Sequence, residues 1–404
     1  MVALGDYKLV DGGIAAPLRF VAGGTTAGIK ASGNMDMAGV FSEAGVCSAA
    51  GVFTTNVVKA PSIRYNRAVV GRGRAQAVVC NSGNANACTG SGGVDDTMQM
   101  AGAMASKLAI SPDLILVCST GVIGHRLPME KIESGIRDLQ LTADGGPQAA
   151  EAIMTTDAFP KHAALELDTP AGPVRIGGMC KGAGMIHPNM ATMLAFIATD
   201  AAIDPDLLTS ILKPAVDDSF NMISVDGDSS TNDTVLFLAN GASAVTVEPK
   251  TELVDEFARA VGALCAHLAT EIVRGGEGAS KLFAVSVKGA SSRAQARTIA
   301  RSVTSSNLFK AAVHGSDPNW GRILCAAGYS GAEFDPDRTD VWIGPFRVFS
   351  GGVPQEYSEV DASRYLDGPE SEVVIDLHTG RFEAVAWGCD LSKEYVEVNA
   401  DYTT

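Results

Sequence analysis

A threonine in the middle of the chain lies where a glycine-containing loop runs into an apolar stretch. Residues 181–200 read KGAGMIHPNMATMLAFIATD, and Thr192 directly precedes the apolar stretch. The two glycines permit unusual backbone dihedral angles, and residues 193–198 are expected to form a buried strand. A threonine hydroxyl held at the start of a rigid strand can act as a nucleophile, so Thr192 is the candidate catalytic residue.

A threonine inside a polypeptide has no built-in base to activate its hydroxyl. Cleavage between Ala191 and Thr192 would give Thr192 a free α-amine, whose pKa of about 7.7–8.0 suits a base at neutral pH. Activation of a threonine by its own N-terminal amine is an established covalent strategy. Taken alone, the same residues also fit an ordinary glycine-rich turn that enters a core strand.

Two further residues could stabilise negative charge in such a reaction. Thr120 and Gly121 closely follow an apolar run over residues 114–118, which predicts a strand that ends beside them. The threonine hydroxyl and the glycine backbone N–H could donate hydrogen bonds to the oxyanion that forms during acyl transfer. A plain turn at the end of a strand is the alternative explanation.

A third group of polar residues would suit an amino-acid substrate, which presents a carboxylate, an ammonium group and a second polar end. Residues 155–157 read Thr-Thr-Asp, Lys181 supplies a positive charge and Glu277 supplies a negative one. A helix cap at Thr155 and solvated surface charges at the other two positions are the ordinary alternatives. We therefore take these residues as candidates for substrate binding.

The composition is that of a globular α/β enzyme. The chain has 404 residues, of which 46% are hydrophobic and 44 are glycines, so it can bury a large core and make many tight turns. Its 46 acidic and 31 basic side chains give a net charge of −15, which argues against nucleic-acid or anionic-membrane partners. The N-terminus lacks the pattern of a secretory signal, and no apolar run is long enough to span a membrane.

The histidines and cysteines do not form a recognisable metal-binding pattern. The six histidines are isolated, and the eight cysteines contain no CxxC pair, so neither a metal site nor a disulfide framework is expected. Scattered cysteines suit reduced, buried thiols in a cytoplasmic protein. The chain also lacks a GxSxG elbow and the full dinucleotide- and phosphate-binding glycine patterns, so no cofactor is expected.

The apolar periodicity predicts alternating strands and helices around the candidate residues. Strands are expected over residues 75–80, 114–118, 193–198 and 282–287, with paired strands across a turn within 165–177. Helices are expected over residues 95–108, 128–139, 147–154, 252–273 and 293–303. Residues 1–74 and 341–387 indicate sheet and turns, and residues 315–322 indicate a tightly ordered structural loop.

Several motifs, in one order, resemble the ArgJ family, the ornithine acetyltransferases of arginine biosynthesis, which are also called glutamate N-acetyltransferases. The segment KGAGMIHPNMATMLAFIATDA resembles the self-cleaving segment of that family. The other matching motifs are NSGNANACTG at 81–90, CSTGVIG at 118–124, AIMTTDAFPK at 152–161, SSTNDT at 229–234, GEGASK at 276–281, GSDPNWGR at 315–322 and NADYTT at the C-terminus. The resemblance implies an α/β fold with sheets layered between helices, ArgJ/DmpA-like and similar to N-terminal-nucleophile hydrolases.

The resemblance also implies roles for individual residues. Self-cleavage after Ala191 would separate an alpha fragment, residues 1–191, from a beta fragment, residues 192–404, that begins with the nucleophile Thr192. Thr120 and Gly121 match the oxyanion-hole pair of the family. The positions that match substrate-binding residues are Thr155, Lys181, Thr192, Glu277, Asn399 and Thr404.

The implied activity is the transfer of an acetyl group from N2-acetylornithine to glutamate through an acetyl-threonine ester, in the cyclic route to arginine. The family implies an assembly of two alpha and two beta fragments and no cofactor, and the sequence leaves open whether acetyl-CoA is a second acetyl donor. Two alternatives stay open. The self-cleaved threonine could serve hydrolysis, as in N-terminal-nucleophile aminopeptidases, or the chain could be an uncut protein that binds acidic amino acids.

Overall fold

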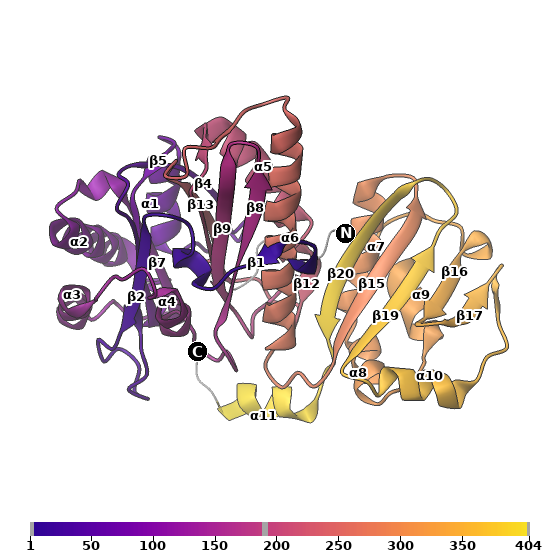
Figure 1. Ribbon diagram of the computed structural model, residues 1–404. Coiled ribbons are helices and arrows are strands. Elements are labelled where there is room, and N and C mark those ends of the chain that lie inside the picture. Colours follow the sequence, from indigo (N-terminus) through magenta and orange to yellow (C-terminus); the bar gives the residue numbers. More distant parts are fainter. Residues whose placement is uncertain (1–3, 188–192, 402–404) are drawn as a thin grey trace.

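The chain folds into layers of sheets and helices (Figure 1), as seen in a computed structural model that describes residues 4–187 and 193–401. The described residues form a four-stranded sheet, two seven-stranded sheets and a small two-stranded sheet. The small sheet pairs β11 (Ala202–Ile203) with β14 (Thr246–Val247). The predicted fold class, α/β with sheets layered between helices, is confirmed.

The four-stranded sheet is built from residues 20–122 and has the order β2-β3-β6-β7. Its strands are β2 (Phe20–Thr25), β3 (Met37–Ser42), β6 (Ala77–Asn84) and β7 (Ile115–Val122). The last two strands run parallel, so that their polar C-terminal ends lie side by side, with Ser82 opposite Thr120. The predicted oxyanion residues, Thr120 and Gly121, lie at these C-terminal ends.

The first seven-stranded sheet has the order β1-β8-β9-β10-β13-β4-β5. Its strands are β1 (Lys8–Leu9), β8 (Lys161–Thr169), β9 (Gly172–Lys181), β10 (Leu194–Thr199), β13 (Thr234–Ala239), β4 (Cys47–Phe53) and β5 (Arg74–Ala75). Strand β10 pairs with β9 in antiparallel fashion, which places Leu194 opposite Lys181. Strand β13 pairs with β4. Residues before and after position 191 are therefore interleaved in one sheet.

Apolar side chains fill the space between these two sheets. Apolar side chains also cover the outer face of each sheet. Phe20 and Val40 from the four-stranded sheet share a buried cluster with Phe196 and Leu236 from the seven-stranded one. Helices α1 (Pro61–Val70) and α4 (Gly146–Ala152) contribute to the same cluster. The sheets thus pack face to face, as their alternating apolar strands dictate.

Helices cover the two outer faces. Helices α2 (Gly90–Leu108) and α3 (Met129–Asp138) pack on the four-stranded sheet, where Met100 and Ile132 share a cluster with Val117. Helices α5 (Pro205–Asp217) and α6 (Glu252–Arg274) pack on the seven-stranded sheet, where the Phe257 ring stacks on Phe237 with centroids 6.5 Å apart. The order of layers is therefore helix, sheet, sheet, helix (Figure 1).

The C-terminal half adds a second seven-stranded sheet beyond α6, in the order β12-β20-β15-β19-β16-β17-β18. Its strands are β12 (Ile223–Ser224), β20 (Phe382–Cys389), β15 (Leu282–Ala290), β19 (Glu370–Asp376), β16 (Asp340–Ile343), β17 (Phe346–Ser350) and β18 (Val353–Pro354). The helices of this part are α7 (Arg293–Thr304), α8 (Asn307–His314), α9 (Trp320–Gly328) and α10 (Glu359–Leu366). Helix α11 (Lys393–Asp401) then leads back toward the N-terminal layers (Figure 1).

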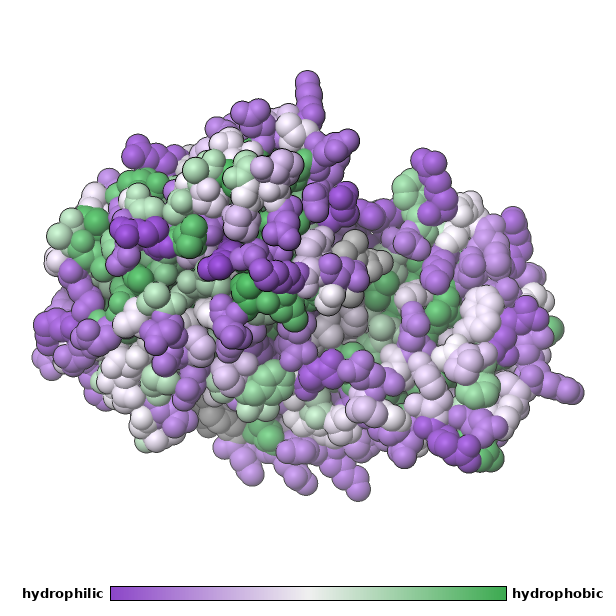
Figure 2. Space-filling view, in the orientation of Figure 1, coloured by the Kyte–Doolittle hydropathy of each residue, from purple (hydrophilic) through white to green (hydrophobic). Residues whose placement is uncertain are grey.

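Short 3-10 turns complete the fold at Leu4–Asp6, Gly13–Ala15, Pro112–Leu114, Phe220–Met222 and Pro336–Arg338. The face shown in Figure 2 is largely hydrophilic, with hydrophobic residues in small separated patches. No helix formed by residues 4–187 or 193–401 is both long and apolar enough to cross a bilayer. All eight cysteines are free thiols, but Cys88 and Cys325 are exposed, so the expectation of buried thiols was wrong for these two.

Candidate active site

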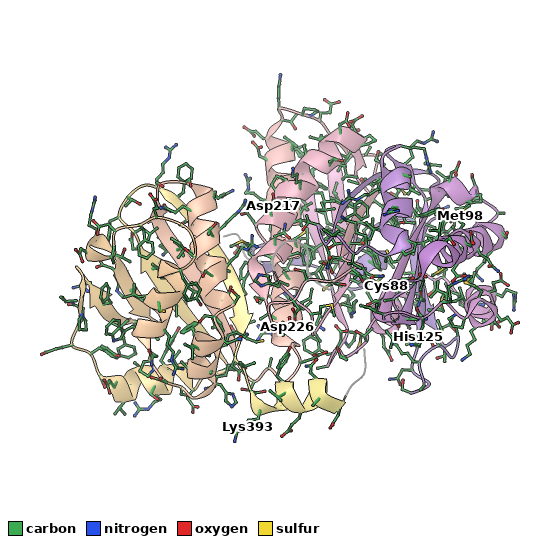
Figure 3. The ribbon with its side chains drawn as sticks, turned by 180° about the vertical axis from the view of Figure 1, so that it is seen from behind. Cys88, Met98, His125, Asp217, Asp226 and Lys393 are labelled. Atoms are coloured by element: carbon green, nitrogen blue, oxygen red, sulfur yellow. The ribbon has the colours of Figure 1, made fainter. Side chains whose placement is uncertain are left out.

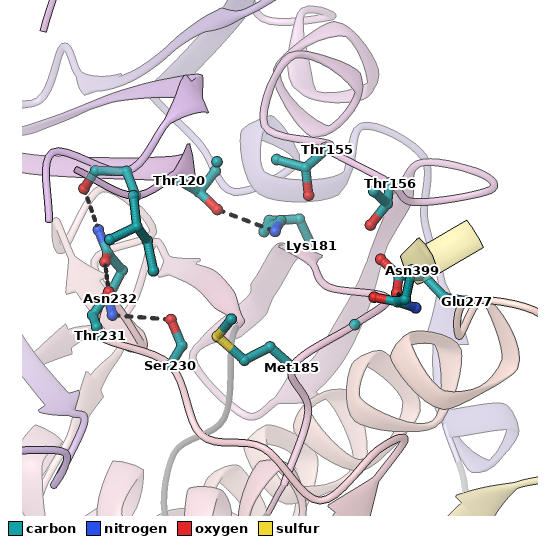
Figure 4. A pocket seen from close by; sticks show the side chains of 14 residues that line it. Thr120, Thr155, Thr156, Lys181, Met185, Ser230, Thr231, Asn232, Glu277 and Asn399 are labelled. Atoms are coloured by element: carbon teal, nitrogen blue, oxygen red, sulfur yellow. Dashed lines mark hydrogen bonds between the residues drawn. The ribbon is translucent and has the colours of Figure 1, made fainter. Parts of the chain in front are cut away.

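A pocket of about 640 Å³, its open mouth included, lies where the N-terminal layers meet α11 (Figure 4). Residues from both halves of the chain line it, and most of them lie in the segments that connect strands and helices. Six residues that the family resemblance assigns to the site lie in its lining: Thr120, Gly121, Thr155, Lys181, Glu277 and Asn399. The candidate Thr156 also lines the pocket, whereas the candidate Asp157 does not. The fold therefore brings together positions that span most of the sequence.

The oxyanion candidates lie at the C-terminal end of β7. Gly121 has a φ of 128°, a conformation that L side chains rarely adopt, and a Cβ atom there would lie 2.3 Å from the carbonyl carbon of Gly83. Only glycine fits this close approach of the two parallel strands. The packing of β6 on β7 thereby fixes the backbone that presents the Thr120 hydroxyl and the Gly121 N–H.

Lys181 ends strand β9, and its side chain points toward Thr120 (Figure 4). The Nζ atom lies 3.1 Å from Thr120 Oγ1, and the lysine is only 2% exposed. Burial lowers the pKa of Lys181, while the negative charge of Asp157 acts in the opposite direction. Because the ammonium donates to the hydroxyl oxygen, the hydroxyl hydrogen of Thr120 is free to donate to another acceptor.

Glu277 and Asn399 lie on another side of the pocket. Glu277 follows the end of α6, and its Oε2 atom accepts a hydrogen bond of 2.9 Å from Asn399 Nδ2 on α11. A Cβ atom at Gly184 would lie 2.4–2.6 Å from the Glu277 carboxyl group, so glycine is needed for this close approach. The described part of the C-terminal segment is thus folded as a helix against the pocket, as expected for a docked terminus.

Asp157, a candidate for substrate binding, does not line the pocket but holds the backbone around it. Its Oδ2 atom accepts from the Thr155 N–H at 3.0 Å, and its Oδ1 atom accepts from the Gly182 N–H at 2.7 Å. Lys161 Nζ donates to Oδ1 at 2.7 Å. Burial raises the pKa of Asp157, but the charges of Lys181 and Lys161 outweigh burial and lower it.

Residues 230–232 also line the pocket and were missed, although they belong to the SSTNDT motif. Asn232 Nδ2 donates to the carbonyl oxygens of Ala85 at 2.6 Å and Ser119 at 2.9 Å. Its own Oδ1 accepts from the Thr231 hydroxyl at 2.5 Å. Asn232 therefore ties this segment to the residue directly before Thr120.

Two carboxyl groups, the half-buried Asp226 and the fully buried Asp233, hold the chain on either side of the predicted cleavage point. Asp226 accepts from the N–H groups of Met185 at 2.5 Å and Ile186 at 2.9 Å, and burial raises its pKa to about 6. Asp233 accepts from the Met193 N–H at 3.0 Å, and burial raises its pKa well above its ordinary value. Figure 3 shows Asp226 near the middle of the molecule, where the C-terminal sheet meets the other layers.

The predicted residues Ala191, Thr192 and Thr404 lie outside the described residues. Their roles, and those of the six residues in the pocket, stay predictions. Among residues 4–187 and 193–401, no three or more histidine, cysteine, aspartate or glutamate side chains are arranged to hold a metal ion.

Comparison with known proteins gives the family. The profile of the ArgJ family matches residues 21–404. The arginine biosynthesis bifunctional protein ArgJ of Symbiobacterium thermophilum is 52% identical, over 97% of this chain and 99% of its own length.

Two solved structures are also similar. Arginine biosynthesis bifunctional protein ArgJ of Bacillus halodurans is 41% identical with a TM-score of 0.50, covering 51% of this chain and 98% of its own. Ornithine acetyltransferase of Mycobacterium tuberculosis, complexed with ornithine, is 45% identical with a TM-score of 0.43, covering 45% of this chain and 97% of its own. With its family profile matched over nearly the whole sequence and a full-length relative at 52% identity, this chain belongs to the ArgJ family.

Proposed function

We propose that this member of the ArgJ family is an acetyltransferase of arginine biosynthesis that moves the acetyl group of N2-acetylornithine to glutamate. The products are ornithine and N-acetylglutamate. The observation that carries the proposal is the pocket, which gathers Thr120, Gly121, Lys181, Glu277 and Asn399 in a chain that is 52% identical to an ArgJ protein over 97% of its length. We further infer that the enzyme acts in the cytoplasm, where its thiols would stay reduced.

The charges of the pocket suit substrates that are amino acids. Lys181 supplies the positive group for a carboxylate, and Glu277 supplies the negative group for an ammonium. Asn399, bonded to Glu277, offers both donors and an acceptor at the same place. Thr155 adds a hydroxyl to the lining, and Thr404 would add a further polar group.

We assign the nucleophile to Thr192. Its hydroxyl would attack the acetyl carbonyl carbon of N2-acetylornithine while its α-amine takes the hydroxyl proton. The Thr120 hydroxyl and the Gly121 N–H would stabilise the oxyanion of the tetrahedral intermediate. The C–N bond then breaks, the proton passes to the departing amine of ornithine, and an acetyl ester of Thr192 remains.

Glutamate would complete the cycle from the same position. Its neutral amine attacks the ester carbonyl, the same two donors hold the second oxyanion, and the proton of the amine returns to the Thr192 oxygen as the ester bond breaks. One nucleophile serves both half-reactions, so ornithine must leave before glutamate enters.

The free amine of Thr192 requires cleavage of the Ala191–Thr192 bond. The Bacillus halodurans chain aligns over 98% of its length yet covers 51% of this chain, which is the size of a fragment cut near the middle. Cleavage would not release the halves from each other, because β9 pairs with β10 and β4 pairs with β13 across the division. We propose an assembly of two alpha fragments, 1–191, and two beta fragments, 192–404.

The test is an assay of the purified protein with N2-acetylornithine plus glutamate and, separately, with acetyl-CoA plus glutamate. The proposal expects N-acetylglutamate in the first reaction, and the second reports whether acetyl-CoA is also a donor. Free acetate in place of N-acetylglutamate would show that water is the acceptor and that the protein is a hydrolase. Binding of glutamate with no acetyl transfer from either donor would contradict an enzymatic role.

A further inference from the structure

We propose that Asp157, held in place by Lys161, is a positioning residue of this site: it fixes the backbone on two sides of the pocket and supplies a negative charge to the Lys181 ammonium. The part of the inference that concerns substrate binding rests on the acetyltransferase function proposed above. Neither Asp157 nor Lys161 lines the pocket, so both would act through the residues that do.

The buried pair has no evident value for stability alone. The side chains of Asp157 and Lys161 are both 0% exposed, and their charged atoms lie 2.7 Å apart. Removing two charges from water is so unfavourable that apolar residues of similar size often serve a fold equally well. We therefore attribute this buried ion pair beside the pocket to its effect on the residues of the pocket and not to stability.

The remaining hydrogen bonds of Asp157 point to the pocket. Its two oxygens accept from the N–H groups of Thr155 and Gly182, which flank the pocket from the end of α4 and the end of β9. Lys161 completes the set by donating to Asp157 and to the carbonyl oxygen of Phe159 at 3.3 Å, over the Phe159 ring. One carboxylate thus connects the segments that carry Thr155 and Lys181.

The Asp157 carboxylate also acts on the charge of Lys181. The titratable groups that act on Lys181 in the described part of the chain are Asp157, Lys161, Cys80, Asp233 and Lys30. Burial raises the pKa of the Cys80 thiol to about 12, and burial also raises the pKa of Asp233. The pKa of Asp157 is instead lowered, and among these groups its charge is the one that favours the Lys181 ammonium most.

Lys181 needs this anion because it is itself fully buried and because Lys161 and Lys30 are like charges nearby. A neutral lysine could neither attract a substrate carboxylate nor donate its charge-assisted hydrogen bond to Thr120. Loss of the Asp157 charge should therefore change substrate binding and the oxyanion donor together.

A direct test measures the pKa of Lys181 by NMR in protein labelled with 13C at lysine Cε, with the signal assigned by its loss in Lys181→Met. In Asp157→Asn the pKa of Lys181 should fall by about one unit or more, the usual effect of losing an adjacent opposite charge. An unchanged value in folded Asp157→Asn overturns the proposal. If that variant does not fold, Asp157→Ser, which also removes the charge, is measured in its place, and an unchanged Lys181 pKa in it overturns the proposal in the same way.

Asp200→Asn is the matched control. Asp200 is also a buried carboxyl group that accepts two backbone N–H bonds, from Leu18 and Arg175, each at 2.9 Å. It follows the far end of β10, away from the pocket. Loss of a buried hydrogen-bonding carboxylate should lower the stability of both variants, but only Asp157→Asn should move the Lys181 titration.

Kinetics then separate this proposal from the proposed function. For Asp157→Asn, kcat/KM for acetyl transfer should fall about tenfold or more above the new pKa of Lys181 and recover toward the wild-type value below it. A loss that is equal at every pH would show a merely structural role. If the wild-type chain transfers no acetyl group, the proposed function fails, while the NMR titration still decides the role of Asp157.

Discussion

The ammonium nitrogen of Lys181 lies 3.1 Å from the hydroxyl oxygen of Thr120, in a part of the pocket where the lysine is almost completely buried. This contact joins the residue expected to bind a carboxylate to the residue expected to hold the oxyanion. Because Lys181 donates to a lone pair of the Thr120 hydroxyl oxygen, the hydroxyl hydrogen must point away from Lys181. The group expected to bind the substrate carboxylate therefore also orients the donor expected to stabilise the oxyanion.

Replacement of Thr120 should separate these two effects. Thr120→Ala removes the hydroxyl donor and should lower kcat by about 10²–10³, with a smaller effect on substrate affinity. Thr120→Ser keeps the hydroxyl and the contact with Lys181, so it should retain most of the activity. Steady-state kinetics of both variants provide the check, and an unchanged turnover in Thr120→Ala would remove Thr120 from the mechanism.

A methyl group at Gly184 should displace Glu277. The Cβ atom of Gly184→Ala would overlap the Glu277 carboxyl group, so that carboxylate must move away from its position beside Asn399. We expect kcat/KM to fall about tenfold or more, because a tenfold fall corresponds to the loss of ~1.4 kcal/mol, the size of one charged contact. Gly102→Ala, in α2 with nothing within 4 Å of the new atom, is the control and should leave kinetics unchanged.

The C-terminal segment should contribute to substrate binding rather than to assembly of the enzyme. Asn399→Ala removes the hydrogen bond to Glu277, and deletion of residues 402–404 removes Thr404. Both changes should raise KM for N2-acetylornithine and for glutamate while self-cleavage proceeds. Wild-type KM values for both substrates in the truncated, cleaved enzyme would mean that the tail does not serve the site.

Asp226 should make stability depend on pH in the acidic range. Burial raises its folded-state pKa from 3.8 to about 6, so between these values the folded protein binds more protons than the unfolded one. Its contribution to the free energy of unfolding is therefore fully present below pH 3.8 and is lost as pH rises through 6. The slope is at most about 1.4 kcal/mol per pH unit.

Urea unfolding at several pH values compares the wild type with Asp226→Asn. As pH rises from 4 to 6, the wild type should lose stability relative to the Asp226→Asn variant. A difference that stays constant across this range would mean that Asp226 titrates alike in the folded and unfolded states.

Local patterns predicted many elements of the fold. The helix expected over residues 252–273 is α6, Glu252–Arg274, because its apolar spacing is a local signal. The strand expected over 193–198 is β10, Leu194–Thr199. The strand predicted over 75–80 corresponds to β6, which begins at Ala77 and continues through buried polar residues to Asn84, while Ala75 belongs to β5.

Other features depend on contacts between distant residues, which a single sequence does not reveal. Residues 315–322 were predicted as a loop, but Trp320 begins α9 because Asn319 caps that helix and the Trp320 ring stacks on Phe349. Asp157 was predicted to contact the substrate, but its hydrogen bond to Gly182 gives it a different place, behind the pocket wall. Asn232 was missed, and it is bonded to the carbonyl oxygens of Ala85 and Ser119.

The most direct test of the proposed mechanism is the intact mass of the purified enzyme after incubation with N2-acetylornithine in the absence of glutamate. We predict two fragments, residues 1–191 and 192–404, with one acetyl group on the second that disappears when glutamate is added. Thr192→Ala should remain a single chain of 404 residues without acetyl. A preparation that transfers acetyl groups while it consists only of the uncut chain, or whose second fragment never gains an acetyl group, would contradict the mechanism.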